Sequence, residues 1–498
     1  MKKKKEKQDK SKGSNPKMWE KIGNIVKRKW LINGTKTILL VLLIIVIYIG
    51  INIILEKVVL PEIDCTENKI FSLSQETKDK VGDIEKDITI TLINYSNYKS
   101  VINFAERYVE LNSHIKIEKI DDLSARTDLM QKYSLNPTDS MIIVKEGENE
   151  KTLTDNDLHT YDYTTYNQID VTEEAITNAI MDVITEEKSK IYFMSNHTMY
   201  STQYFGSIME AMKNEANEVE TLDILANGGI PEDCDCLVIS TLKEDLTEPE
   251  KDKIIAYIKN GGKLLLMCGP NINNVALNNF QKVLDEYGIT IEKGVIFEEN
   301  TANMVSGYPD FIIEDVQSNS LTKKLNMNMK LCLIDAAKIT YNSEKSEELG
   351  VEYENLASTT EKAFVRTNLN QNSPTKTAED GNQETITIAA IATKKIEEGK
   401  TSKLIIYGNE LFAMDMQVQI NGYTMSTVNL YNNKDLILNS IAYLNEREDT
   451  ITIRKDYQTV NYTVTEQQNT IIMTVIFTLP ILIIIAGIIV WQVRRRKK

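Results

Sequence analysis

The sequence contains few of the residues from which most catalytic and metal-binding sites are built. Its 498 residues include three His and five Cys, with no C-x-x-C and no clustered His/Cys spacing. Zinc binding and dithiol redox chemistry are therefore not expected. The sequence also lacks G-x-x-x-x-G-K-[ST], the loop that cradles nucleotide phosphates, so it predicts no ATP site. We expect no catalytic residue, no metal and no cofactor.

One cysteine and one histidine nevertheless lie where a nucleophile and its base could lie. Cys268 follows the apolar stretch KLLLM, and His197 is the only His near the end of a predicted strand. The neighbours of Cys268 are too bulky for a nucleophile elbow, so we expect a buried thiol. His197 remains the candidate binding residue. Cys234 and Cys236 alternate within one apolar stretch, which predicts two buried thiols on the same face of a strand.

Two long apolar segments lie near the ends of the chain, and positive charge flanks both. Residues 1–30 carry a net charge of +9 and residues 494–498 carry +5, whereas the whole chain carries −15, so the residues between carry −29. Apolar segments of about 20 residues can cross a bilayer as helices, and Lys and Arg mark the cytoplasmic side. We predict a two-pass protein of the cell membrane, with transmembrane helices over 31–55 and 471–493. Both basic tails are then cytoplasmic and the acidic centre is extracytoplasmic, joined to the second span by a linker over 451–470.

The acidic centre is predicted to contain two α/β units. In 64–185, a strand, a helix and two further strands indicate a small layered unit compatible with a thioredoxin-like fold. In 186–300, short apolar strands alternate with amphipathic helices, which predicts a mostly parallel, doubly wound sheet. Ligands of such sheets bind at the carboxyl ends of the strands. The α/β pattern continues more loosely over 301–450, where the polar segment 369–383 is predicted to be a mobile surface loop.

Several local patterns predict where helices begin and end. The predicted N-cap and capping-box residues are Ser74, Asp170 with Glu173, and Thr247 with Glu250. The stretch YIKNGGKLLLMCGP over 257–270 places Gly261 and Gly262 between a helix and a strand, the opposite order from a phosphate-binding loop. Because glycine adopts the left-handed conformation that ends helices, both glycines are predicted to be structural.

Several separated motifs resemble those of the gliding-motility-type ABC transporter auxiliary proteins, a substrate-binding-like family. The longest motif, IPEDCDCLVISTLKEDLTEPEKDKIIAYIKNGGKLLLMCGP over 230–270, is similar to the family's Ile-Pro-x-Asp-x-Asp strand, Leu-Thr/Ser-x-x-Glu helix and Tyr-Ile-x-x-Gly-Gly-Lys turn. The other motifs follow in the family's order: DCTENKIFSLSQETKDKV (64–81), IDVTEEAITNAI (169–180), LASTTEKAF (356–364), NKDLILNSIAYL (433–444), and a final Leu-Pro-containing span before Arg-Arg-Arg.

Two loops depart from the family's pattern. Asn196-His197-Thr198-Met199 stands where the family has Gly-His-Gly-Glu, and Thr241-Leu242 stands where it has Gly-Pro. Ligand contacts made by these loops in relatives are therefore not carried over to this chain.

The resemblance implies an extracytoplasmic, membrane-anchored auxiliary subunit that works with an ABC permease and an ATPase. It also implies a central domain with a glutamine-amidotransferase-like fold but without that chemistry. The expected role is binding or coupling and not catalysis, with the two transporter subunits and membrane lipid as partners and no nucleic acid. Two alternatives stay open: a surface hydrolase that uses the strand end near Cys268 and His197, and a scaffold of the cell envelope.

Overall fold

The computed structural model describes residues 72–162, 167–322, 329–371, 373–396, 399–420 and 422–447, with isolated positions 39, 42, 43, 46, 49, 478, 485, 487, 492 and 495. The elements discussed below all lie in the unit that begins at Asn68. In this described part of the chain, no helix combines the length and the apolar character needed to cross a bilayer. Apart from the isolated positions, the predicted spans 31–55 and 471–493, both tails and the linker lie outside the described residues.

A four-stranded mixed sheet forms the first α/β layer, in the order β2-β1-β3-β4. Strand β1 is parallel to β2 and antiparallel to β3, which is antiparallel to β4. Helices α3, α4 and α6 bury apolar side chains on one face of the sheet, and α5 packs against the other. The bounds are α3 Gln75–Val81, β1 Ile88–Ile93, α4 Lys99–Leu111, β2 Ile115–Ile120, α5 Thr127–Tyr133, β3 Met141–Glu146, β4 Asn149–Leu153 and α6 Thr172–Ile184. The thioredoxin-like assignment of this layer stays a prediction.

The capping predictions for this layer have mixed outcomes. The Ser74 hydroxyl accepts a hydrogen bond from the Thr77 amide at 3.1 Å, which confirms the predicted N-cap. The capping box of Asp170 and Glu173 is wrong, because the cap of α6 is Val171 and has no side-chain bond. The Glu173 carboxylate instead accepts hydrogen bonds at 2.6 Å from the Ser74 amide and the Thr77 hydroxyl. A contact distant in sequence thus replaces the predicted local one.

A seven-stranded sheet forms the centre of the region from β7 to α11, in the order β17-β19-β20-β10-β9-β7-β8. Five adjacent strands, β8, β7, β9, β10 and β20, run parallel to one another. Strand β19 pairs antiparallel with β20, and β17 pairs antiparallel with β19 at the edge of the sheet. The bounds are β7 Ser189–Met194, β8 Asn217–Leu222, β9 Cys236–Ser240, β10 Leu264–Met267, β17 Val351–Ser358, β19 Thr387–Lys395 and β20 Thr401–Tyr407. The predicted α/β class is confirmed, with mixed rather than purely parallel sheets.

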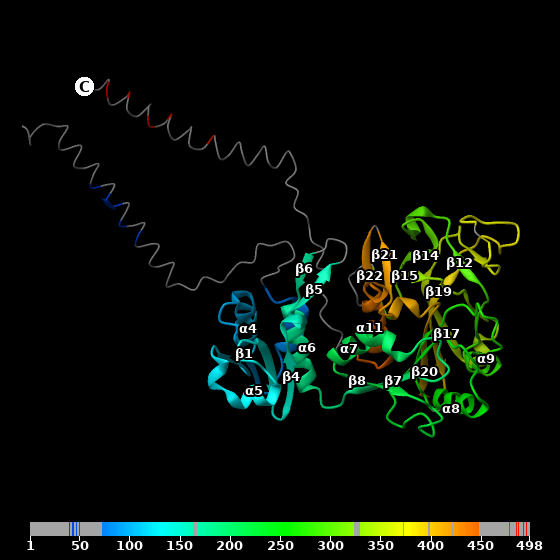
Figure 1. The fold of residues 1–498 in the computed structure, drawn as a ribbon, viewed down its shortest axis with the longest axis horizontal. Coiled ribbons are helices and arrows are strands. Elements are labelled where there is room, and N and C mark those ends of the chain that lie inside the picture. Colours follow the sequence, from blue (N-terminus) through cyan, green and yellow to red (C-terminus); the bar gives the residue numbers. More distant parts are fainter. Residues whose placement is uncertain are drawn as a thin grey trace, which may run out of the picture. The chain divides into compact units, whose positions relative to one another are not determined.

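Helices cover both faces of the seven-stranded sheet (Figure 1). Helices α7 Gly206–Asn214 and α11 Asn433–Leu444 bury their apolar sides on one face, and α8 Glu248–Lys259 and α9 Asn278–Asp285 bury theirs on the other. Side chains alternate along each strand, so the neighbours Val238 and Ile239 belong to opposite cores. Burial on both faces explains why these strands are continuous apolar runs in the sequence.

The remaining strands form small sheets, and one short α-helix lies among them. They are β5 His159–Asp162 with β6 Asn167–Asp170; β11 Ile289–Ile291 with β16 Ile339–Tyr341; β12 Val295–Phe297 with β18 Phe364–Arg366; β13 Met304–Val305, β14 Tyr308–Asp315 and β15 Lys330–Ile334 in one sheet; α10 Ser346–Leu349; and β21 Gln417–Ile420 with β22 Tyr423–Ser426. Of these, β12, β14 and β15 contribute to the candidate site.

The turn after α8 confirms one glycine prediction and corrects the other. The capping box of Thr247 and Glu250 is present at the start of α8. At its end, Gly261 has φ +90°, the left-handed conformation expected of a helix-terminating glycine. Gly262 does not have a positive φ; a Cβ there would lie 2.4 Å from the ring of Tyr257. Both glycines are structural, but Gly262 is required for space and not for backbone conformation.

Candidate binding pocket

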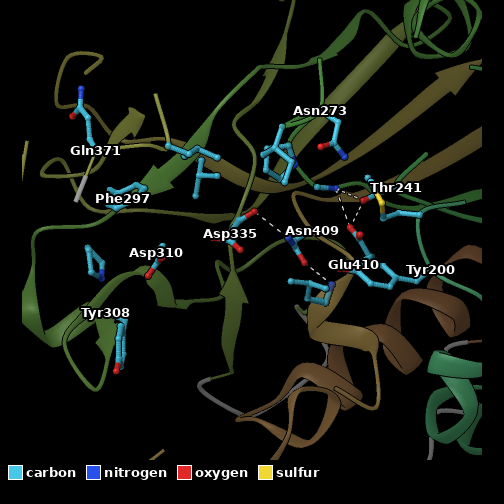
Figure 2. A pocket seen from close by; sticks show the side chains of 18 of the residues that line it. Tyr200, Thr241, Asn273, Phe297, Tyr308, Asp310, Asp335, Gln371, Asn409 and Glu410 are labelled. Carbon is cyan, nitrogen blue, oxygen red and sulfur yellow. Dashed lines mark hydrogen bonds between the residues drawn. The ribbon is translucent and has the colours of Figure 1, made fainter. Parts of the chain in front are cut away.

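A pocket of about 470 Å³ lies at the carboxyl ends of the parallel strands (Figure 2). The loops that follow β7, β9, β10 and β20 contribute Met199, Tyr200, Thr241, Gly269, Pro270, Ile272, Asn273, Asn409, Glu410 and Leu411. The remaining lining residues come from β12, β14, the residue after β15 and a distant loop: Val295, Phe297, Tyr308, Pro309, Asp310, Asp335, Leu369, Gln371, Ser373 and Pro374. This edge of the sheet is where ligands of open α/β folds bind. We call this cavity the strand-end pocket.

A buried carboxylate lies on the sheet side of the strand-end pocket. The side chain of Glu410 accepts hydrogen bonds through Oε2 from the Thr241 hydroxyl and, at 3.2 Å, from the Gly269 amide. The Gly269 amide also donates to Thr241 Oγ1 at 2.7 Å, and a Cβ at Gly269 would lie only 3.0 Å from the carboxylate. Burial raises the pKa of Glu410 against these hydrogen bonds, and the charge of Asp335 adds to the increase.

Two further carboxylates, those of Asp310 and Asp335, lie on a wall formed by β14 and the residue after β15. Burial raises the pKa of Asp335 to about 6, and the neighbouring charge of Asp310 contributes. The main chain ties the two residues together, since the Asp335 amide donates to the Asp310 carbonyl at 2.9 Å. Asn409 Nδ2 donates to the Asp335 carbonyl at 3.0 Å (Figure 2), which links this wall to the loop that carries Glu410.

Aromatic and amide side chains line the space between the carboxylates. Tyr200, Phe297 and Tyr308 provide the aromatic surfaces, and Asn273 and Gln371 provide amides. Burial raises the pKa of Tyr200, and the charges of Glu410 and Asp335 raise it further. None of the described residues that line the pocket is Lys, Arg or His. The pocket therefore combines negative charge with aromatic surface and has no cation of its own.

The segment 369–383, predicted to be a mobile surface loop, forms one wall of the strand-end pocket. It is hydrogen-bonded to the buried side chain of Arg366. The Arg366 side chain is fully buried and donates two hydrogen bonds to Asp380, at 2.9 and 2.8 Å. It also donates to the Ser373 carbonyl and to the Thr375 carbonyl. The guanidinium lies 4.2 Å from the ring centroid of Phe297. The described residues of this loop are thus hydrogen-bonded around a paired internal cation, and its mobility stays a prediction.

His197 contacts a helix terminus and does not line the strand-end pocket. Its Nε2 lies 3.0 Å from both carboxylate oxygens of Glu250, the buried residue of the α8 capping box, and Asn196 Nδ2 donates to the same carboxylate. Burial alone would raise the pKa of Glu250, but hydrogen bonds from Thr247 and Asn196 together with the charge of His197 outweigh it, and the pKa is lowered. The loop of His197 also pairs with the loop after β9, through an antiparallel bridge between Thr198 and Leu242.

The candidate nucleophile Cys268 is buried among apolar side chains. Its Sγ lies 3.9 Å from the Ile239 carbonyl, and burial raises its pKa well above the ordinary value. A neutral buried thiol is a poor nucleophile. Cys234 and Cys236 are buried as predicted, but they belong to opposite cores, because Cys234 precedes β9 and the strand alternation does not reach it.

The pocket carboxylates were not singled out from the sequence, although a signal existed for one of them. Glu410 comes three residues after β20, where the carboxyl-end rule places ligand-binding groups. Asp310 belongs to β14 and Asp335 follows β15, two strands that carry no clear alternation in the sequence. No local pattern predicts that these two residues would meet at the pocket.

The sequence profile of a family described as "ABC-type uncharacterized transport system" matches residues 188–440, just over half of the 498 residues. The chain belongs to this family. Family membership makes it an auxiliary component associated with an ABC-type transport system. The matched residues begin just before β7 and end within α11, so they include the seven-stranded sheet and the whole lining of the strand-end pocket.

Comparison with other proteins gives only distant likenesses. The mmIFT52 N-terminal domain aligns at 13% identity over 51% of this chain and 97% of its own, with a TM-score of 0.37. A ThuA-like protein from Parabacteroides merdae aligns at 9% identity over 54% and 99% (TM-score 0.33), and a GMP-synthase-type protein from Thermoplasma acidophilum at 11% over 53% and 96% (TM-score 0.27). TM-scores this low support no argument. No curated protein matches the chain.

Proposed function

We propose that the protein is a two-pass membrane protein of the gliding-motility type and an auxiliary subunit of an ABC transporter. Its extracytoplasmic part has a binding or coupling role in the transporter complex. In this proposal the basic tails at both ends are cytoplasmic, and residues 64–450 lie outside the membrane. ATP is hydrolysed by a separate cytoplasmic subunit, since the sequence has no phosphate-binding loop.

One observation carries the proposal. The residues matched by the transport family, 188–440, are those that build the seven-stranded sheet and the strand-end pocket. A pocket at the carboxyl ends of a parallel sheet is the usual place for a small-molecule site in such folds. The family supplies the transport context, and the pocket supplies a means of binding within it.

We propose a binding role and not a catalytic one because of how the candidate groups are placed. Cys268 is a buried thiol with a raised pKa, and His197 is hydrogen-bonded to the ionised Glu250. A hydrolase of the nucleophile–base type requires these two groups to bond to each other. The hydrolase alternative therefore has no geometric support among the described residues.

The test is affinity purification of the tagged full-length protein from native membranes in mild detergent. We expect an ABC ATPase and a permease to be enriched over a control purification that uses an unrelated tagged two-pass protein. Cys268→Ala and His197→Ala should recover the same partners, because neither side chain lines the strand-end pocket.

The opposite outcome is equally concrete. Purified full-length protein that hydrolyses esters or amides, with the rate lost in Cys268→Ala but not the fold, would assign it to the hydrolases. A variant that lacks residues 230–270 would not distinguish the two functions. These residues contain β9 and β10 in the middle of the seven-stranded sheet, so their removal would disrupt the fold itself.

A further inference from the structure

We propose that the strand-end pocket binds a small organic molecule through its protonated amino group, with Asp310 and Asp335 as the residues that contact the ammonium. This inference rests on the binding role proposed above and names the chemical class of the ligand. Four features of the pocket support it: unpartnered carboxylates, a fixed geometry, the remaining lining, and the size of the cavity.

The carboxylates of the strand-end pocket have acceptor atoms without donors. Within the described residues, the side chains of Asp310 and Asp335 have neither a hydrogen bond nor a salt bridge. Glu410 is only 4% exposed, and its carboxylate accepts hydrogen bonds from Thr241 and Gly269 through Oε2. Asp310 and Asp335 are only partly buried and line the cavity, so a donor group of a ligand can reach their oxygens.

The position of Asp335 is fixed by the main chain and not by its own side chain. Its φ is +52°, a left-handed conformation that is uncommon outside glycine, although aspartate adopts it more readily than most residues. The hydrogen bonds from its amide to the Asp310 carbonyl and from Asn409 to its carbonyl hold this conformation. The two negative side chains are thus kept near each other although they repel. A bound cation would remove that repulsion.

The rest of the lining suits a cation with an organic body. The aromatic rings of Tyr200 and Tyr308 can contact both an ammonium and its carbon skeleton. Phe297, which already packs against Arg366, adds apolar surface, and the nearby amides can bond hydroxyl groups. A volume of about 470 Å³ is in the range of small-molecule sites. Among the described residues, no three His, Cys, Asp or Glu lie in an arrangement that could hold a metal ion. Free acceptors also favour a primary ammonium, which donates hydrogen bonds, over a quaternary one.

The test is calorimetric titration of the full-length protein in detergent at pH 7.5 with four cationic probes: glucosamine, spermidine, ethanolamine and lysine methyl ester. N-acetylglucosamine and glucose serve as neutral controls for the sugar. We expect at least one amine to bind, and to bind at least tenfold more tightly than the neutral sugars. Absence of binding by all four amines, or equal binding by N-acetylglucosamine, would overturn the proposal.

Matched variants locate the site. Asp335→Asn and Asp310→Asn should each weaken amine binding at least tenfold, and asparagine tolerates the left-handed conformation at position 335, so the fold should persist. Asp121→Asn, an exposed acid in the first α/β layer, should leave the affinity unchanged. Unchanged affinity in both pocket variants, with unaltered melting curves, would place the amine elsewhere and refute the assignment.

The pH dependence gives an independent readout. The ionisable groups that face Asp335 are Asp310, Glu410 and Tyr200, and no cationic side chain of a described residue lines the pocket. Because the pKa of Asp335 is about 6, amine affinity should fall several-fold from pH 7.5 to pH 5.5 in the wild type and change less in Asp335→Asn. An equal pH dependence in the two proteins would contradict the role of Asp335.

The two proposals can fail separately. If the transporter subunits co-purify but no amine binds, only the ligand class is wrong. If amines bind through Asp310 and Asp335 but no ATPase or permease co-purifies, the transporter role is wrong and the ligand class stands.

Discussion

Burial and pairing divide the carboxylates of this protein into two groups. Asp380 is held by Arg366, which lowers its pKa to about 2, and Glu250 is held by Thr247 and also remains ionised. At Glu314, Asp335 and Glu410 burial is the largest cause, and it raises the pKa of all three. The first group stabilises loops and helix ends, whereas two of the second group line the strand-end pocket.

The raised pKa of Glu314 should make the stability of the folded protein depend on pH. Substitution of this one residue should remove that dependence. Burial and the charge of Glu298 raise its pKa from 4.5 to about 8. The folded state therefore holds a proton that the unfolded state has lost, and stability falls as the pH rises from about 4.5 to about 8. Glu314→Gln keeps the neutral shape, so its melting temperature should match the wild type at pH 5 and exceed it at pH 8.5. Glu348→Gln, at an exposed site, is the control; a parallel shift in both variants would refute the account.

Substitutions at Gly262 and Gly261 should destabilise the fold for different reasons, steric overlap at Gly262 and backbone conformation at Gly261. The ring of Tyr257 is held in place by hydrogen bonds between its hydroxyl and the main chain of Lys263, at 3.1 Å, so it cannot easily move away from a new side chain. We expect Gly262→Val to cost about 1–3 kcal/mol, as overpacking does. Gly261→Ala, whose Cβ would lie 3.4 Å from the nearest atom, should cost about 1–2 kcal/mol for its left-handed backbone. Denaturant unfolding of both variants measures this; unchanged stability with lost ligand binding would make the turn functional.

At the scale of elements, the helices and strands of the seven-stranded sheet could be predicted because each carries its own pattern. The apolar run of β10, the capping box of α8 and its terminal glycine are all local signals. The strands β14 and β15 could not be predicted, since both of their faces are buried in separate cores and their sequences therefore show no polar–apolar alternation. The site was predicted only in position, at the carboxyl ends of the strands. Its carboxylates come from segments that local patterns do not connect.

Loss of the buried cation Arg366 should strongly destabilise the loop over 369–383. Arg366→Met would leave the Asp380 carboxylate buried without its partner, and breaking such a pair costs on the order of 3–5 kcal/mol. The loop should then open, and trypsin should cut after Lys376 much faster than in the wild type. Arg366→Lys should be intermediate, since lysine cannot make the two parallel hydrogen bonds to Asp380.

Lys362→Met is the control for the loop, because Lys362 is exposed four residues before Arg366. It should leave the rate of cleavage unchanged. Equal trypsin resistance of Arg366→Met and the wild type would show that the loop does not depend on this cation.

At the scale of the whole molecule, the strand-end pocket depends on segments far apart in the chain. Its lining begins at Met199 and ends at Leu411, and the loop held by Arg366 is inserted between strands of the same sheet. Such a site exists only when the seven-stranded sheet is complete. The family match over 188–440 covers the same extent, which is consistent with one cooperative unit carrying the transport-related function.

The arrangement across the membrane gives the last prediction. The net charges of +9 and +5 at the two ends and −29 between them predict cytoplasmic termini and an extracytoplasmic centre. The test starts from a protein whose five native cysteines are replaced and introduces one cysteine at a time, by Lys12→Cys, Asn370→Cys or Lys497→Cys. Labelling with a membrane-impermeant maleimide then shows on which side of the membrane each position lies. Asn370 is exposed and does not line the strand-end pocket, so its substitution should be tolerated. In intact cells Asn370→Cys should be labelled, and the two terminal cysteines should react only after permeabilisation. Labelling of either terminus in intact cells, or protection of Asn370→Cys, would reverse the proposed topology and with it the side of the membrane on which the pocket meets its ligand.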